Sequence, residues 1–560
     1  MNTALGVLGL ATGLLNAAIV ARADVPAAQL PISEVSRAIR AAVGTGDAVS
    51  GPIRPKERAQ LTVLYDAGGF APLWVDASGD PTRDARIALG VIAQAAEEGL
   101  EPSDYRGGAV QDLATALAGA TTRQAADIAQ FDVELSASTL RYFRHVHMGR
   151  VDPRSIGFRM TTPADEHDFG AMLRSALAEH RLDETAASLT PPLALYRGLR
   201  ATLAQYRALA ADPTLGLLTS FATSVKPGEP YIGVTALRRL LVALGDLPPN
   251  AGGRVESSVY EGVLVDGVRH FQLRHGLEAD GILGKATQTA LGVPLSRRVR
   301  QIELALERLR WLPHLADRFL AVNIPMFHLW AWDGFPANRA PSLDMDIIVG
   351  RALNRQTPVF VEEMKYIIFR PYWNVPPSIL RGEVVPALRR DPDYLRRQDM
   401  EIVSGPGDGA QPVALSAESL AALEHGVLRV RQRPGPKNSL GLVKFVFPND
   451  YNVYLHGTPA PQLFRQPRRD FSHGCVRVAD PVALAAWALK AQQKWARDAI
   501  LAAMNADRPS QVTLTRPIQV ILFYVTAAVM PADGTIHFAE DIYGHDAKLD
   551  RALRDTLGKD

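Results

Sequence analysis

The spacing of apolar residues divides the chain into a helical part and a later part rich in strands. Between residues 32 and 225 apolar positions recur at intervals of three and four, as at Ile87, Val91 and Ile92, which is typical of amphipathic helices. One more amphipathic helix is expected from Arg298 to Leu312, where Pro313 ends it. Beyond it the pattern changes to short apolar runs and alternation, which predict β-strands. The expected strands are 319–324, 327–332, 346–349, 365–369, 443–447, 451–455 and 518–526.

A charged, arginine-rich segment with helical spacing interrupts these strands. It occupies about residues 377–402 and lies between two expected strands. Long segments of this kind often cover a site. We therefore predict a helical insertion that acts as a lid, and the pattern leaves open whether that lid moves.

A small helical module is expected between residues 226 and 296. Its distinctive part begins with Phe271-Gln272 and continues through Gly276-Leu277, Asp280-Gly281, Gly284 and Thr287. The glycines mark turns between short helices. From composition alone this region would be no more than a helical miniature domain.

Length and charge limit the class of protein. A chain of 560 residues predicts three to four domains, because a single core stops growing near 250–300 residues. Hydrophobic residues make up 47% and charged residues 21%, so the chain is not broadly disordered. The net charge of +2 is too small to attract nucleic acid over the whole surface.

The N-terminal segment predicts export. Residues 4–21 form an apolar run that ends in Ala21-Arg22-Ala23, with small residues at the positions that a signal peptidase requires. Residues 1–23 are therefore expected to be a signal peptide. Because Met1 to Thr3 include no basic residue, an uncleaved inner-membrane anchor is the alternative.

The single cysteine, Cys475, is the main candidate for chemistry. A thiol near its reference pKa is a weak nucleophile and needs a base or a positive field. His456 ends an expected strand and offers that base, while the carbonyl of Gly457 could fix its tautomer. Gly474 lets the backbone approach closely, so the amides of Gly474 and Cys475 could bind an oxyanion.

The alternative to catalysis is an inert thiol beside a structural histidine. We find no phosphate-binding glycine loop and no zinc-ligand spacing, so no cofactor and no metal are expected. The residues alone therefore indicate a cysteine acyltransferase or hydrolase.

Two blocks of sequence carry a resemblance to a known family. Tyr454-Leu455-His456-Gly457-Thr458 is followed by Ser472-His473-Gly474-Cys475-Val476-Arg477, and the cysteine stands 19 positions after His456. This resembles the catalytic signature of the L,D-transpeptidases of bacterial walls. The small helical module resembles a peptidoglycan-binding domain. This module, the helical N-terminal region and the segment that begins at Trp373 make the chain similar to the large periplasmic L,D-transpeptidases of Gram-negative bacteria.

The resemblance implies roles for individual residues. Cys475 would be the acylated nucleophile, His456 its general base and Gly457 the carbonyl that orients the imidazole. Gly474 and Cys475 would supply the amides that bind the oxyanion, and His473 would line the catalytic site. The residues expected to line the substrate site are Arg477, Tyr454, Trp373 and Ser472.

The same resemblance implies an architecture and an activity. The fold is expected to be multidomain α+β, with an α-helical scaffold (32–225), a three-helix peptidoglycan-binding-like module (226–296) and a β-rich catalytic domain (297–560). The enzyme would act in the periplasm, take a donor tetrapeptide and an acceptor amine, release D-Ala and form 3-3 cross-links. Residues 231–291 would bind a glycan strand, and a carbapenem would acylate Cys475.

Three alternatives stay open from the sequence. Water as acceptor would give an L,D-carboxypeptidase, and a protein lysine would give an anchoring ligase. A non-catalytic wall-binding scaffold is the third. The activating partners and the oligomeric state are also open.

Overall fold

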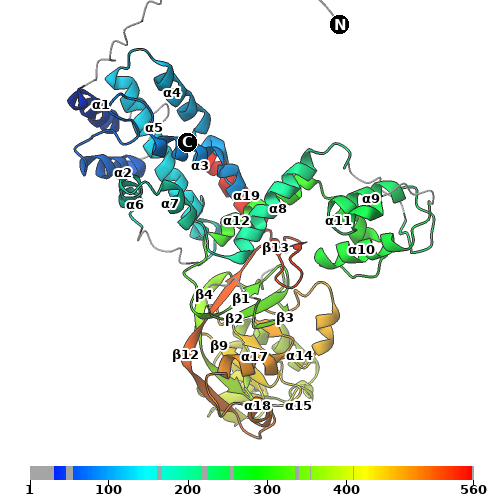
Figure 1. Cartoon of the computed structure of the whole chain (residues 1–560). Coiled ribbons are helices and arrows are strands. Elements are labelled where there is room, and N and C mark those ends of the chain that lie inside the picture. Colours follow the sequence, from blue (N-terminus) through cyan, green and yellow to red (C-terminus); the bar gives the residue numbers. More distant parts are fainter. Residues whose placement is uncertain are drawn as a thin grey trace, which may run out of the picture.

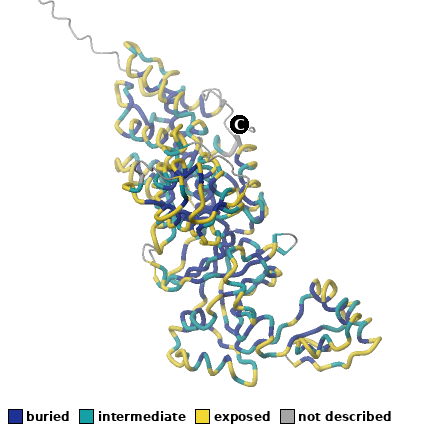
Figure 2. Tube along the Cα trace, turned by 90° about the vertical axis from the view of Figure 1, so that its right-hand side faces the viewer, coloured by how far each residue is buried: buried dark blue, intermediate teal, exposed yellow. Residues whose placement is uncertain are grey.

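The computed structural model describes residues 31–45, 55–160, 167–215, 223–252, 258–334, 340–352, 355–407 and 409–557. Figure 1 shows three arms that meet at a central group of helices: a helical domain, a small helical module and a β-rich domain. Buried segments gather where the arms meet and inside each arm, as Figure 2 shows. The predicted multidomain α+β architecture is therefore confirmed.

The first arm is a helical domain around one apolar core. The long helix α5 lies at its centre and contacts α1, α3 and α4. Buried Asp132 on α5 accepts hydrogen bonds from the backbone N–H groups of Leu73 (3.0 Å) and Trp74 (2.8 Å) and from the hydroxyl of Tyr65 (2.7 Å). The carboxylate thereby fixes the chain that leads into α3. The helices are α1 (Ile32–Thr45), α2 (Pro55–Asp66), α3 (Arg83–Ala93), α4 (Gly107–Gly119), α5 (Ala125–Met148), α6 (Phe169–Ala178) and α7 (Leu182–Ser188), with short 3₁₀ turns η1 (Ala95–Glu98), η2 (Pro102–Tyr105) and η3 (Pro153–Ile156).

The region 32–225 was expected to be one helical scaffold, but its last helix belongs to a different core. Helix α8 (Ala194–Ala211) packs on α12 (Leu295–Leu309) and against the β-rich domain. Its buried residues Tyr196, Leu199 and Leu203 all contribute to that second core. Helical spacing predicts which face is apolar but not which neighbour covers it, and this explains the difference.

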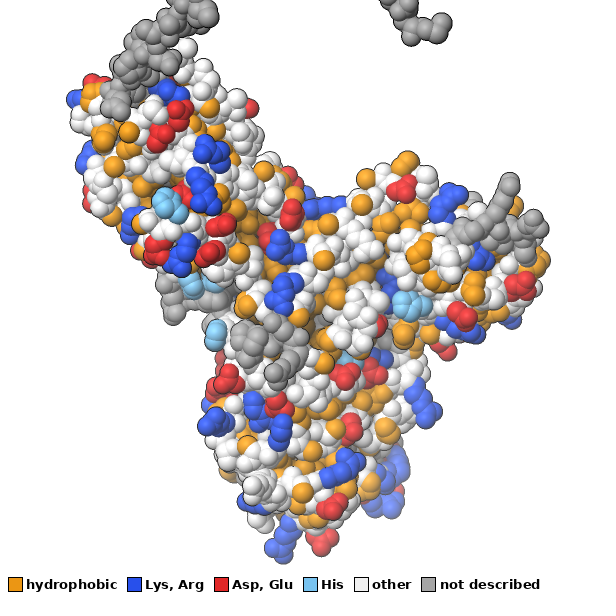
Figure 3. Space-filling view, in the orientation of Figure 1, with side chains coloured by type: hydrophobic (Ala, Val, Ile, Leu, Met, Phe, Trp, Pro, Cys, Tyr) orange, Lys and Arg blue, Asp and Glu red, His pale blue; other side chains and the backbone are white. Residues whose placement is uncertain are grey.

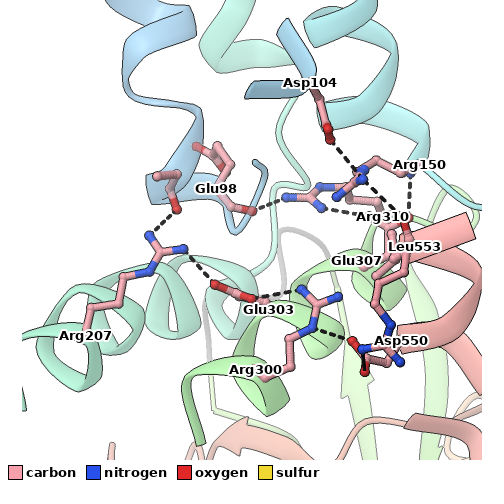
Figure 4. Close-up of polar contacts among 12 residues, drawn as sticks. Glu98, Asp104, Arg150, Arg207, Arg300, Glu303, Glu307, Arg310, Asp550 and Leu553 are labelled. Carbon is pink, nitrogen blue, oxygen red and sulfur yellow. Dashed lines mark hydrogen bonds and ion pairs between the residues drawn. The ribbon is translucent and has the colours of Figure 1, made fainter. Parts of the chain in front are cut away.

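The arms are joined by ion pairs around α12, with the C-terminal helix α19 (His545–Leu557) on one side (Figure 4). Buried Arg310 pairs with Glu307 (3.1 Å) and donates to the backbone carbonyl of Glu98 in the helical domain. Arg300 on α12 pairs with Asp550 on α19 (2.7 Å). Arg310 thus connects the end of α12 to the helical domain, and Arg300 connects α12 to α19.

The second arm is the three-helix module that was expected. It comprises α9 (Val234–Ala243), the 3₁₀ turn η4 (Pro249–Gly252), α10 (Val263–Arg274) and α11 (Lys285–Leu291). The side chain of Gln272 donates to Asp280 (2.8 Å) and to Thr287 (3.0 Å) and accepts from the N–H of Gly281 (2.8 Å). The residues of the recognised pattern therefore hold the turn between α10 and α11 together.

The third arm is built on a closed eight-stranded barrel. The strand order is β1-β12-β4-β9-β10-β11-β3-β2, and β1–β12 and β10–β11 are parallel pairs. The strands are β1 (Arg318–Asn323), β2 (His328–Asp333), β3 (Leu343–Ile348), β4 (Phe360–Phe369), β9 (Val443–Val446), β10 (Leu455–His456), β11 (Val476–Val478) and β12 (Ser510–Phe523). The barrel is accompanied by η6 (Pro461–Arg465), α17 (Pro481–Leu489), α18 (Arg497–Met504) and the hairpin β13 (Ala527–Val529) and β14 (Ile536–Phe538). The strand predicted at 451–455 is mostly irregular, since Asn452 has a positive φ of 55° and pairing begins only at Leu455.

The insertion is larger than the predicted 377–402 and is not only helical. It has its own core and a four-stranded sheet of order β5-β8-β6-β7. Its elements are β5 (Trp373–Asn374), α13 (Pro377–Ile379), the π-helix η5 (Leu380–Val384), α14 (Val385–Arg390), α15 (Tyr394–Arg397), β6 (Met400–Ser404), β7 (Gln411–Val413), α16 (Ala417–Glu424) and β8 (Arg429–Gln432). The strands have three to five residues except β5, which has two, so they give little periodicity by which to predict them. We call this unit, residues 373–432, the cap.

Within the described ranges, none of the helices combines the length and the apolar character that a membrane span requires. The signal peptide or anchor expected at residues 1–23 lies outside those ranges.

Candidate functional site

Strand β10 sets the positions of the candidate residues. Its parallel pairing with β11 puts His456 opposite Arg477, and its antiparallel pairing with β9 puts His456 opposite Lys444. Residues paired across strands share a face of the sheet, so these three side chains form one row. Leu455, next to His456, is fully buried in the barrel core on the opposite face.

The next row of the same face holds Tyr454 and Cys475. The N–H of Val476 donates to the carbonyl of Tyr454 (3.1 Å), which places Cys475 beside Tyr454. The rings of Tyr454 and His456 lie 5.7 Å apart, in keeping with their i, i+2 positions. Cys475 and His456 are therefore diagonal neighbours on adjacent strands, a spacing that large side chains can bridge.

Glycine is required at the turn that carries Cys475. Gly474 has a φ of +119°, which side chains with a Cβ rarely adopt. Its N–H donates to the hydroxyl of Ser472 (3.1 Å), and its carbonyl accepts from the hydroxyl of Thr357 (2.8 Å). The hydroxyl of Ser472 in turn donates to the carbonyl of Cys475 (2.5 Å).

This geometry corrects two predictions. Ser472 was expected to bind substrate, but its hydroxyl is buried and holds the turn instead. The N–H of Gly474 was expected to bind an oxyanion, but Ser472 accepts it here. The N–H of Cys475 is then the local donor left for an oxyanion, since the described residues provide no recorded acceptor for it.

The thiol of Cys475 is half-buried and protonated at neutral pH. Its Sγ donates to the carbonyl of Asn452 (3.6 Å). Burial raises the pKa of Cys475, and the backbone and hydroxyl of Tyr454, followed by Lys444 and Arg477, lower it by less. The positive charges thus favour a thiolate without producing one at rest.

His456 is neutral in the same pH range. Its Nδ1 lies 2.5 Å from the carbonyl of Gly457; a carbonyl only accepts, so Nδ1 carries the proton and Nε2 is the basic nitrogen. Burial and the nearby charges of Arg477 and Lys444 lower the pKa of His456 to about 3, and the carbonyls of Gly457 and Leu440 oppose this effect. The resting pair is a thiol and a neutral imidazole.

Tyr454 and Trp373 were predicted as walls of the substrate site; the structure brings Tyr454 to the sulfur and Trp373 to the hydroxyl of Tyr454. Trp373 comes from β5 of the cap and hydrogen-bonds the Tyr454 hydroxyl, which also hydrogen-bonds Cys475. Lys444 Nζ lies 3.8 Å from the centre of the Tyr454 ring. Burial and the neighbouring sulfur raise the pKa of Tyr454, so its hydroxyl stays protonated and can donate.

Two predicted residues lie at the mouth of the site. The ring of His473 is exposed and its Nε2 contacts Glu383 of the cap (2.8 Å). Arg477 is half-buried; burial and the charge of Arg351 lower its pKa, and its Nε has no recorded hydrogen-bond partner among the described residues. Arg477 thus presents an unsatisfied cation beside the sulfur.

Sequence reasoning missed Glu383 and Arg355. Glu383 lies in the π-helix η5 and pairs with both Arg355 (2.8 Å) and His473. These pairs connect the cap to the catalytic turn. A π-helix often marks a functional position, but no sequence pattern predicted one here.

The described residues include no cluster of three or more histidine, cysteine or acidic side chains that could hold a metal ion. The groups that the site brings together are a thiol, a neutral imidazole and an amide donor. Together these groups suit acyl transfer.

Comparisons with known proteins agree with this arrangement. Residues 317–501 match the model of the L,D-transpeptidase catalytic domain, residues 232–291 match that of the "Putative peptidoglycan binding domain", and residues 59–203 match that of the Scaffold domain. A curated protein of Haemophilus influenzae, named "Putative L,D-transpeptidase", is 31% identical over 268 residues, which is 46% of this chain and 51% of that protein. The chain thus spans about half the length of this relative. Residues 317–501 of the β-rich arm are thus similar to an L,D-transpeptidase catalytic domain, and the same polypeptide carries segments that are similar to a scaffold domain and to a peptidoglycan-binding domain.

Proposed function

We propose that this protein is a cysteine-dependent L,D-transpeptidase that forms 3-3 cross-links between peptidoglycan stem peptides in the periplasm. The observation that carries the proposal is the pairing of β10 with β11, which puts Cys475 and His456 on one face with Nδ1 of the imidazole fixed by Gly457. The catalytic-domain match and the peptidoglycan-binding match support peptidoglycan as the substrate.

The first half-reaction forms a thioester. Nε2 of His456 takes the thiol proton while Sγ of Cys475 attacks the carbonyl between meso-diaminopimelate and the terminal D-Ala of a tetrapeptide. The negative charge that develops on the carbonyl oxygen is stabilised by the N–H of Cys475. The C–N bond then breaks, the imidazolium gives its proton to the leaving amine, and D-Ala departs.

The second half-reaction releases the enzyme. The side-chain amine of a second stem peptide attacks the thioester carbonyl, and His456 takes the proton that this amine loses. The C–S bond breaks and the sulfur recovers its proton from the imidazolium. The imidazole is neutral before each attack, so a nitrogen is free to accept the proton. Because its pKa is about 3, the proton moves only as Sγ or the amine bonds to the carbonyl carbon.

Tyr454 and Arg477 support these steps. The Tyr454 hydroxyl donates to the sulfur and stabilises negative charge on it. Arg477 offers its cation to the carboxylates of the stem peptides, a charge-assisted contact. We also expect a carbapenem to acylate Cys475, because its strained carbonyl resembles the donor amide.

The test uses the full chain and the free tetrapeptide L-Ala-γ-D-Glu-meso-diaminopimelate-D-Ala. We expect intact mass spectrometry to detect an adduct of the tripeptide on the wild type, with release of D-Ala and formation of cross-linked dimers. Cys475→Ala is the matched control and should form neither adduct nor product. A wild type that forms no adduct refutes the proposal, and an adduct that yields only free tripeptide favours the carboxypeptidase reaction.

A further inference from the structure

A groove lies between the peptidoglycan-binding module and the catalytic barrel. Its volume is about 690 Å³. Leu273, Leu277 and Lys285 line it from the module, and His328 and Arg468 line it from the barrel. In Figure 3 the module overhangs the β-rich domain on the right of the view, with a notch between them.

The two walls of this groove are held in a fixed relation. Arg274, at the end of α10, is 2% exposed and pairs with Asp246 of the module (2.5 Å). The same guanidinium donates to the hydroxyl of Tyr206 on α8 (3.3 Å) and to the carbonyl of Ile536 on β14 (3.3 Å). A buried cation shared between the module and its neighbours makes the groove a preformed feature.

The module presents side chains to the groove that its own fold does not need. The polar residues of its recognised pattern, such as Gln272, are engaged in the internal turn. Leu273 is 60% exposed, and Lys285 is exposed with no recorded ion pair among the described residues. An exposed apolar side chain beside a free cation suits a ligand that has both apolar faces and carboxylates.

The barrel wall of the groove is connected to the nucleophile by short contacts. Arg469 follows Arg468, and its carbonyl accepts from the N–H of Val349 (2.9 Å), whose own carbonyl accepts from the N–H of Ser472 (2.9 Å). Ser472 in turn bonds the carbonyl of Cys475. Arg469 and Ser472 thus both bond the backbone of Val349, and the six residues from Arg469 to Cys475 can span at most roughly 20 Å.

We propose that this groove binds a glycan strand, so that the module and the barrel together hold the strand whose stem peptide is acylated. This inference rests on the proposed function and adds the place where the sugar chain lies. The three residues from the lactyl group to meso-diaminopimelate span about 10 Å when extended, which suits a short path from the groove to the sulfur. Lys285 contacts carboxylates of the neighbouring stems on the same strand, and Leu273 packs on the sugar rings. Arg468, which pairs with Asp470 (2.8 Å) and with the exposed Glu540 (3.3 Å), exchanges Glu540 for such a carboxylate.

The test compares two substrates in the full chain. The first is a preparation of uncross-linked glycan strands that carry tetrapeptide stems, and the second is the free tetrapeptide. In the Cys475→Ala background, we expect Lys285→Glu, Leu273→Asp and Arg468→Glu each to weaken binding of the strands by about tenfold, as removal of a central contact does. In the active enzyme, D-Ala release from the free tetrapeptide should change less than about twofold, because the small substrate does not reach the groove.

Each change has a matched control outside the groove. Ile232 is 98% exposed on the same module, so Ile232→Asp repeats the apolar-to-acidic change. Lys226 on the module and Arg516 on the barrel are exposed, so Lys226→Glu and Arg516→Glu repeat the charge reversals. These controls should bind strands like the parent protein.

The outcomes separate the two proposals. The groove proposal is wrong if the three groove variants bind strands as the parent protein does, or if only the two module variants lose strand binding. It is also wrong if D-Ala release from the free tetrapeptide falls as much as strand binding does. If the free tetrapeptide forms no adduct on the wild type while strand binding still depends on Lys285 and Arg468, the proposed function fails and the groove stands.

Discussion

Gly441 offers a direct test of how the imidazole of His456 is held. It has a φ of +65°, and a Cβ at this position would lie 2.6 Å from the N of Thr458 and 2.7 Å from the carbonyl carbon of Gly457. Ordinary contacts are about 3.5–4.0 Å, so in Gly441→Ala the backbone of Gly457 must move by about 1 Å. The Gly457 carbonyl that fixes His456 would move with it.

The expected effect has two parts. The left-handed conformation costs an alanine about 1–2 kcal/mol, which should lower the melting temperature by a few degrees. Displacement of the base by about 1 Å should slow formation of the acyl-enzyme by about 100-fold. The assay is the time course of the tetrapeptide adduct by intact mass, together with a thermal melt.

Gly426→Ala is the matched control. Gly426 lies in the cap with a φ of +75°, and a Cβ added there would meet no atom within 4 Å, so this change carries the backbone cost without the clash. We expect this variant to lose stability and keep its rate of acylation. If Gly441→Ala and Gly426→Ala acylate at the same rate, the anchoring of His456 through Gly457 is wrong.

Three further predictions concern other contacts. The pKa of His456 is about 3 in the folded protein and about 6.5 in the unfolded chain, so the unfolded chain binds more protons between these two values. The free energy of unfolding should therefore fall by up to about 1.4 kcal/mol per pH unit as the pH drops through this window. Denaturant melts of the wild type and of His456→Asn check this, and an equal dependence of the free energy of unfolding on pH in the two proteins would contradict it. Glu383→Gln should barely change the melting temperature, since exposed ion pairs contribute about 0–1 kcal/mol. It should slow acylation of Cys475 several-fold, because it releases His473 from the cap. An unchanged rate of acylation would argue against a role for that contact. Asp132→Ala should destabilise the helical domain by about 3 kcal/mol in denaturant melts, because the buried N–H groups of Leu73 and Trp74 lose their acceptor. D-Ala release from the free tetrapeptide should stay as in the wild type. A loss of stability under about 1 kcal/mol would show that these hydrogen bonds to Asp132 are dispensable.

Local patterns predicted the features that depend on neighbouring residues. Apolar alternation located β1, β2 and β9, and the turn glycines located the module. The blocks around His456 and Cys475 also suggested that these residues act together, because the two blocks and their separation of 19 positions resemble a catalytic signature. The three-part organisation follows from these patterns.

Features that depend on distant contacts were not predictable in this way. The sheet of the cap forms from short strands, of which β5 and β8 pair although they lie far apart in the sequence, and their shared core stabilises them. The role of Ser472 in the turn depends on a carbonyl three residues away and on burial. The low pKa of His456 arises from burial and then from Arg477 and Lys444 on the two neighbouring strands, whose positions the sequence does not give.

The position of α19 has a consequence for the order of synthesis. Arg300 and Arg308 on α12 find carboxylate partners in Asp550 and Asp546, more than 200 residues later in the chain. Until α19 has emerged, these cations have no such acceptors. The pairs between α12 and α19 therefore form last, and a protein truncated before α19 should lose them while Arg310 keeps its contact with Glu98 of the helical domain.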